Sequence, residues 1–219
     1  MILVSSFASH FIAAQPHFSF PNSPIANEEI VLRWIHIVAG VIWIGLLYFF
    51  NLVGMPAMNA LEETTRRKVY PVFMSRAMSW FRWSALVTVL VGLRYYTILL
   101  QVDAQNTGQP GLLGRWLGEW FLVWILAYVV IYALQMPFGG PLSNGWIRAI
   151  LIAIVVIAAS WLMLEWNAGP DVSNAHLSIS IGGGLGLIML MNAWGIVWRA
   201  QKRMIQWTRA KRRKWRAYS

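Results

Sequence analysis

The stretch RWIHIVAGVIWIGLLYFFNLVGMP, residues 33–56, decides the fold class of this chain. It is apolar apart from a few side chains, and it is longer than the roughly 20 helical residues that cross the core of a bilayer. The whole chain shares this character, since 58% of its 219 residues are hydrophobic, 12% are charged and the mean hydropathy is +0.54. This composition excludes an ordinary soluble domain and predicts an integral membrane protein.

Five apolar stretches are long enough to span a membrane as helices. The sequence therefore predicts an all-α integral membrane bundle of five transmembrane helices over 30–198. We expect an extracytoplasmic N-terminal segment over 1–29, whose first 20 residues lie along the membrane surface, and a basic cytoplasmic tail over 199–219. The main flexible connection is expected at 101–114, where glycine and proline interrupt the pattern. The predicted spans are 30–54, 80–100, 117–136, 147–166 and 176–198.

The distribution of charge gives these spans an orientation. If the N-terminus lies outside, 15 of the 18 Lys and Arg residues fall on the inside or at the adjoining helix ends, and the outside holds Arg33, Arg94 and Arg115. Basic residues gather on the cytoplasmic side of membrane proteins, so we expect an N-out/C-in arrangement. The basic tail then meets anionic lipid headgroups, a reading that we favour over contact with nucleic acid.

Two histidines are the candidate site residues, because an ionisable side chain inside a bilayer is costly and needs a partner. His36 lies about six residues into the first span, and His176 opens the fifth span. The two spans run in opposite directions, so both histidines lie on the outer side. A neutral imidazole can bind a metal through a ring nitrogen. The pair therefore predicts a haem b whose iron has His36 and His176 as its ligands.

The surroundings of these histidines fit the haem hypothesis. Gly40 lies one helical turn from His36 on the same face, and glycines occupy most of 182–186 after the second histidine. These small residues would let a porphyrin approach the helix backbones. Arg94 or Arg115 is predicted to neutralise the propionates of the haem, and Arg33 is a further candidate at the outer face. For Arg94, snorkelling toward the headgroups is the alternative.

Other interpretations of the same residues stay open. A histidine inside a membrane can instead hydrogen-bond to a neighbouring helix, and Gly182-x-x-x-Gly186 is also a packing motif of transmembrane helices. A quinone is an alternative cofactor. The chain has no Cys, which excludes covalent c-type haem attachment and iron–sulfur clusters.

Three ordered motifs carry a resemblance to a known family. They read H-x-x-x-G-x-x-W-x-G-x-x-Y-x-x-N over 36–51, F-R-W-x-A-x-x-T-x-x-x-G over 81–92, and M-x-x-N-x-W-x-x-V-W-x-x-Q-K over 189–202. Together they resemble the membrane domain of the bacterial urate hydroxylase family, known as the urate oxidase N-terminal domain. Full-length members continue into a cytochrome c domain, which we do not expect in a chain with five spans and no Cys. Arg199 also stands where the family motif usually has a proline.

The resemblance implies a redox scaffold of the bacterial inner membrane, and three functions follow as hypotheses. The first is electron transfer linked to haem b or a quinone, within or beside a larger membrane complex. The second is oxidation of a small substrate such as urate, with electrons passed to a separate cytochrome c. The third is a cofactor-free accessory subunit of a membrane complex. The sequence leaves open whether the protein is an enzyme.

Overall fold

Residues 21–136 and 143–217 are described in the computed structural model of the chain, with side chains described as far as Trp207 in the last helix. This part of the chain is helical and contains no strand, which confirms the all-α prediction. Five helical rods are long and apolar enough to cross a membrane, so the protein has the build of a multi-pass membrane protein. The predicted surface segment 1–20 lies outside the described residues. The rods are α2 (Pro24–Tyr48) with the π-helical turn η1 (Phe49–Gly54) and α3 (Met55–Ala60); α4 (Glu63–Asn106); α5 (Leu112–Leu134); α6 (Gly145–Asn167); and α7 (Asn174–Asn192) with the π-helical turn η3 (Ala193–Val197) and α8 (Trp198–Ala217).

The chain divides into two units at Val31, so the described residues 21–31 belong to the first unit and the residues from Leu32 onward to the second. In the first unit, α2 begins at Pro24, whose fixed φ suits the first turn of a helix. Ser23 precedes the helix, and its Oγ accepts a hydrogen bond from the backbone N–H of Ala26 at 3.5 Å. The helix therefore starts before position 30, where the sequence predicted the first span.

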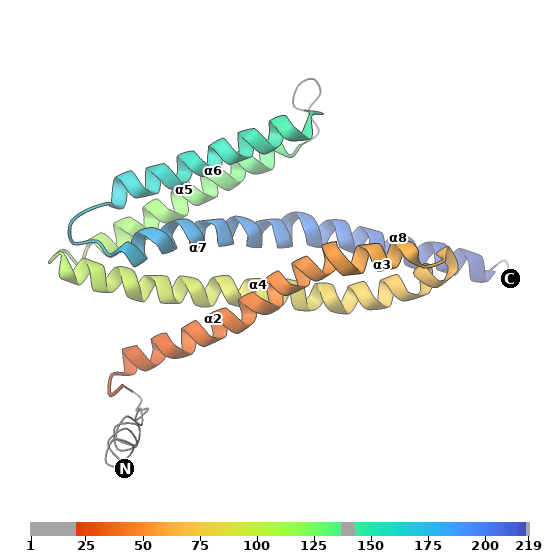
Figure 1. Ribbon diagram of the computed structural model, residues 1–219, viewed down its shortest axis with the longest axis horizontal. Coiled ribbons are helices and arrows are strands. Elements are labelled where there is room, and N and C mark those ends of the chain that lie inside the picture. Colours follow the sequence, from red (N-terminus) through yellow and green to blue (C-terminus); the bar gives the residue numbers. More distant parts are fainter. Residues whose placement is uncertain (1–20, 137–142, 218–219) are drawn as a thin grey trace, which may run out of the picture. The chain divides into compact units, whose positions relative to one another are not determined.

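In the second unit, α4 and α7 lie side by side, and α5 and α6 form an antiparallel pair that packs against them (Figure 1). Helix α4 has 44 residues, which corresponds to about 66 Å at 1.5 Å per residue and to about twice the thickness of a bilayer core. Its first turns pack beside α8, where Tyr70 Oη donates a hydrogen bond to Gln201 Oε1 at 3.0 Å. Much of the segment 55–79, which connects the first two predicted spans, is thus helix.

The connection between α4 and α5 is shorter than the sequence predicted. Helix continues to Asn106 and resumes at Leu112, which leaves only five residues of the expected flexible segment 101–114 as a turn. Gly108 adopts φ +70° there, a left-handed conformation that is accessible to glycine because it has no Cβ. This turn places the end of α4 beside the start of α5.

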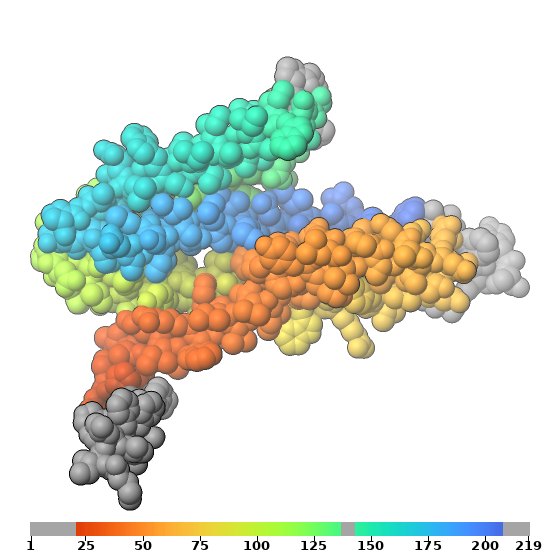
Figure 2. Space-filling view, in the orientation of Figure 1, coloured from red at the N-terminus to blue at the C-terminus, as the bar shows by residue number. Residues whose placement is uncertain are grey.

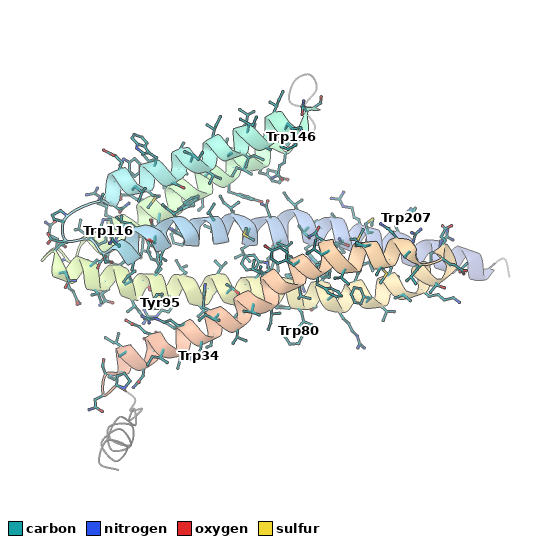
Figure 3. All side chains as sticks on the ribbon, viewed as in Figure 1. Trp34, Trp80, Tyr95, Trp116, Trp146 and Trp207 are labelled. Carbon is teal, nitrogen blue, oxygen red and sulfur yellow. The ribbon has the colours of Figure 1, made fainter. Side chains whose placement is uncertain are left out.

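Two apolar clusters fill the interior of the second unit. The first joins α4, α5, α6 and α7 around the fully buried Trp124 and Met163. The second joins α2, η1, α4, η3 and α8 around Trp43 and Phe81. Large apolar side chains also cover the outside, such as Trp80 and Trp146 at 65% and 80% exposed (Figure 3). An apolar exterior is what a protein surrounded by lipid requires.

Candidate functional site

A cavity of about 630 Å³ lies between α2, α4 and α7, with Trp120 of α5 at one end. Figure 2 shows a hollow between the middle of α2 and α7. The cavity runs between the two apolar clusters, because it is lined by Trp43 from one and by Tyr96 and Trp120 from the other. Its volume falls in the range of about 300–1,000 Å³ that is typical of small-molecule and cofactor sites.

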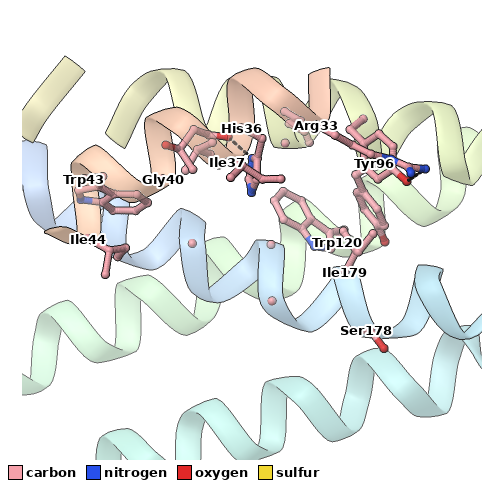
Figure 4. A pocket seen from close by; sticks show the side chains of 18 residues that line it. Arg33, His36, Ile37, Gly40, Trp43, Ile44, Tyr96, Trp120, Ser178 and Ile179 are labelled. Atoms are coloured by element: carbon pink, nitrogen blue, oxygen red, sulfur yellow. Dashed lines mark hydrogen bonds between the residues drawn. The ribbon is translucent and has the colours of Figure 1, made fainter. Parts of the chain in front are cut away.

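The imidazole of His36 points from α2 into this cavity toward α7 (Figure 4). Its Nδ1 lies 2.9 Å from the backbone oxygen of Thr88 on α4. A carbonyl oxygen can only accept, so Nδ1 carries a proton, and in the tautomer that this bond selects the lone pair is on Nε2. No group in the described part of the chain hydrogen-bonds to Nε2. Metal-binding histidines commonly have this arrangement, in which one nitrogen donates to a carbonyl and the other is free to coordinate.

Gly92 provides the space that the His36 ring occupies against α4. A Cβ at this position would lie 2.8 Å from both Nδ1 and Cε1 of His36, closer than real Cβ contacts allow. Thr88 and Gly92 are one turn apart, so the same face of α4 supplies both the hydrogen-bond acceptor and the gap. The ring orientation of His36 is therefore set by two residues of α4.

The glycines of α7 have two different environments. A Cβ on Gly182 or Gly186 would meet no atom within 4 Å, and both residues line the cavity. A Cβ on Gly184 would lie 1.9 Å from Cε2 of Trp124, so this glycine is where the indole packs against the helix. The cavity-wall role and the helix-packing role, which the sequence left as alternatives, occur on different residues of the same run.

Arg33 is the charged side chain that lines the cavity within the described structure. Its Nη2 donates to Tyr95 Oη at 2.7 Å, and its Cζ lies 4.9 Å from the centre of that ring. The two arginines predicted to bind the cofactor do not line the cavity. Arg94 is exposed, and Arg115 pairs with Glu119 at 2.7 Å along α5. Arg33, the further candidate named from the sequence, lies three residues before His36, a spacing that places both on one helix face.

His176 lies in a separate, closed site. Its side chain is 0% exposed, and its Nδ1 is 3.2 Å from Oδ2 of Asp103 at the end of α4. The same oxygen accepts hydrogen bonds from the backbone N–H of Ser173 at 3.1 Å and from its hydroxyl at 2.8 Å. Ser173 in turn caps α7 by accepting from the backbone N–H of His176 at 3.2 Å. Asp103, which the sequence analysis did not single out, thus joins the end of α4 to the start of α7.

The structure does not bring His36 and His176 together. His36 contacts α4 at residues 88 and 92, whereas His176 contacts it at Tyr96 and Asp103. The midpoints of these two contact regions are roughly 14 Å apart along α4 at 1.5 Å per residue. His176 also does not line the cavity, because its ring is enclosed by Trp116 and Tyr96 at centroid distances of 4.8 and 5.8 Å. This arrangement does not support the prediction that the two histidines bind one iron; of the residues predicted for the site, His36 and Gly40 line the cavity.

The described residues contain no group of three or more His, Asp or Glu side chains that could hold a metal ion. What the cavity offers is one imidazole nitrogen, a largely apolar space and one guanidinium. The chain matches no protein family model, no curated protein and no solved structure. Its kinship with the bacterial urate hydroxylase membrane domain therefore stays a prediction from the three sequence motifs.

Proposed function

We propose that this protein is a membrane redox protein that binds one haem b in the cavity, with Nε2 of His36 as a ligand to the iron. The observation that carries this proposal is the hydrogen bond of 2.9 Å from Nδ1 of His36 to the Thr88 carbonyl. It fixes the tautomer in which the lone pair of Nε2 is directed into the cavity, and a hydrogen bond of this kind also raises the basicity of the coordinating nitrogen.

The walls of the cavity support a flat, largely apolar ligand with a charged edge. Gly182 and Gly186 leave open space where side chains would otherwise stand, and Trp43 and Trp120 add aromatic surface. Arg33 is suited to pair with a propionate, because a guanidinium binds a carboxylate through two parallel hydrogen bonds. When bound, the haem would supply a one-electron redox couple, while the protein supplies its ligand, its orientation and its dry surroundings.

The proposal extends to the location and the partners of the protein. We place it N-out/C-in in the bacterial inner membrane, with the basic tail against anionic lipids. A lone haem protein exchanges electrons with something else, so its partner is another subunit of a membrane complex or a separate cytochrome c. Urate-hydroxylase-like oxidation of a small substrate would use the same cavity and the same acceptor.

A quinol is the second candidate for the cavity, on the strength of the same tautomer. Nε2 of His36 can accept a hydrogen bond from a quinol O–H, and Arg33 can donate to the opposite oxygen. The accessory-subunit hypothesis is the case in which the cavity holds only lipid. These three cases differ in what the purified protein contains.

The test is an absorption spectrum of the detergent-purified protein, produced with haem available, in oxidised and dithionite-reduced states. We expect a Soret band in the wild type and its loss in His36→Ala. Gly92→Ala is the matched variant, because it displaces the imidazole without removing it, and we expect it to weaken or shift the band. His176→Asn, whose amide can replace the Nδ1 donor to Asp103, is expected to keep the band.

Each outcome separates the hypotheses. A band that persists in His36→Ala contradicts the assigned ligand, and a band lost in folded His176→Asn restores the two-histidine prediction. A colourless wild type contradicts haem binding. Extraction of a quinone from that colourless protein would support the second candidate, and its absence would favour the accessory subunit.

A further inference from the structure

Arg82 on α4 is surrounded by aromatic rings and has no acidic partner among the described residues. Its Cζ lies 4.0 Å from the ring centre of Trp198, 4.9 Å from that of Trp194 and 5.7 Å from that of Trp83. Its Nε is buried without a hydrogen-bond partner among the described residues. The two terminal nitrogens are not buried in this way, and the side chain as a whole is half-buried.

The tryptophans around Arg82 are held in place by contacts of their own. Trp194 Nε1 donates to the backbone oxygen of Arg82 at 3.2 Å, and the rings of Trp83 and Trp194 meet edge to face at 5.7 Å. Trp194 lies in η3 and Trp198 begins α8, so the π-helical turn presents both rings to the same arginine. Turns of this kind inside α-helices often occur at functional sites. The enclosure of Arg82 is therefore a defined structure and not a chance position of a long side chain.

A guanidinium in this position needs a negative charge that the described protein does not supply. Aromatic faces attract a cation, but they leave its full charge in a low-dielectric region. The cavity ligand is not this counter-charge, because Arg82 does not line the cavity. The inference that follows is accordingly independent of whether haem is bound.

We propose that Arg82, Trp194 and Trp198 form a binding site for the phosphate of an anionic phospholipid. The planar fork of arginine matches a phosphate through two hydrogen bonds. Exposed tryptophans mark the depth of the headgroups in membrane proteins, and the neighbours Trp80 and Trp83 are 65% and 52% exposed.

The charge of the neighbouring segment selects an anionic lipid over a neutral one. Arg66, Arg67 and Lys68 precede Arg82 on α4, and the basic helix α8 packs alongside. A membrane surface beside several Lys and Arg residues attracts anionic lipids. The predicted lipid is thus one whose headgroup has a net negative charge, such as phosphatidylglycerol.

The site is tested by binding of phosphatidylglycerol to the delipidated full-length protein, measured by native mass spectrometry and by the shift of its melting temperature. We expect one tightly retained lipid in the wild type, binding at least about tenfold weaker in Arg82→Gln, and binding about threefold weaker in Arg82→Lys, which keeps the charge but loses the fork. Arg76→Gln is the control, because Arg76 is exposed on the same helix and is expected to leave binding unchanged.

Three results would overturn the proposal. The first is equal lipid retention in wild type and Arg82→Gln. The second is equal stabilisation by inorganic phosphate, which would identify a site for free anions. The third is equal stabilisation by phosphatidylcholine, which would show that the charge of the headgroup is not recognised. If Arg82→Gln does not fold, Arg82→Lys decides, and wild-type affinity in that variant contradicts the predicted fork.

Discussion

Helix α7 has a packed side and an open side, and both use the same residue types. On the packed side, Gly184 lies against the fully buried Trp124, and His176 is enclosed at the start of the helix. On the open side, Gly182 and Gly186 leave space, and a histidine points in from α2. The difference lies in the neighbouring helix, because α5 fills its glycine gap with an indole whereas α2 stands away. A glycine in a helix therefore indicates that another group can come close to the backbone. The neighbouring helix decides whether that space is filled by a side chain or left open as a cavity.

The two histidines show the same contrast in their hydrogen bonds. His36 donates from Nδ1 to a neutral carbonyl that belongs to a helix backbone, and Nε2 opens onto a cavity. Nδ1 of His176 hydrogen-bonds to the carboxylate of Asp103, and its Nε2 is buried and finds no partner in the part of the chain that the structure describes. The first arrangement leaves a ligand position, and the second joins two helices.

The strongest way to break the packed side is Gly184→Ala. The added Cβ would lie 1.9 Å from a ring atom of Trp124, whose side chain is 0% exposed and cannot move outward. Overpacking of a filled core typically costs 1–3 kcal/mol or more, so we expect a loss of about 3 kcal/mol in the free energy of unfolding. Unfolding in mixed detergent–SDS micelles measures this loss.

Gly186→Ala is the matched control, two residues further along α7. An added Cβ there meets nothing within 4 Å, so we expect the free energy of unfolding to change by less than about 0.5 kcal/mol. Equal destabilisation by the two substitutions would contradict the division of α7 into a packed and an open side.

A second and smaller effect is expected from Asp103→Asn. The carboxylate accepts three hydrogen bonds from Ser173 and His176, and it is 3% exposed. An amide keeps the shape but offers one weaker acceptor, so we expect a loss of about 2 kcal/mol in the free energy of unfolding. The same unfolding assay applies. A stability equal to wild type would show that Asp103 does not hold α4 to α7.

The sequence was sufficient for the architecture because the membrane restricts it so strongly. A chain this apolar has to satisfy its backbone hydrogen bonds within helices, and hydropathy therefore located the five long apolar helices of the described residues. It did not locate the helix ends. The first turns of α4 and the first turns of α8 are polar, and they pack on each other, a tertiary effect that hydropathy does not report.

The site was only partly predictable for a similar reason. His36 and Gly40 stand out because one is ionisable and the other is small within an apolar stretch. To predict whether His36 pairs with His176, their relative depth in the membrane has to be known. The sequence showed only that both lie on the outer side, which does not fix that depth closely enough. Asp103 was not singled out because it belongs to the expected connection 101–114, whereas the structure continues α4 through it.

The smallest effect is expected from Glu119→Gln, which sharpens the contrast between the buried and the exposed ion pair. Arg115 and Glu119 lie one turn apart on α5, and the arginine side chain is 57% exposed. Exposed pairs of this kind contribute about 0.2–1 kcal/mol, so we expect a loss of about 0.5 kcal/mol or less in the free energy of unfolding.

Arg115 was also predicted to bind the cofactor, but its place outside the cavity leads us to expect an unchanged absorption spectrum in this variant. A destabilisation as large as that of Asp103→Asn would show that the pair on α5 holds the bundle as firmly as the buried one. A changed spectrum would show that the ion pair, by holding the Arg115 side chain in place, affects the cofactor in the cavity.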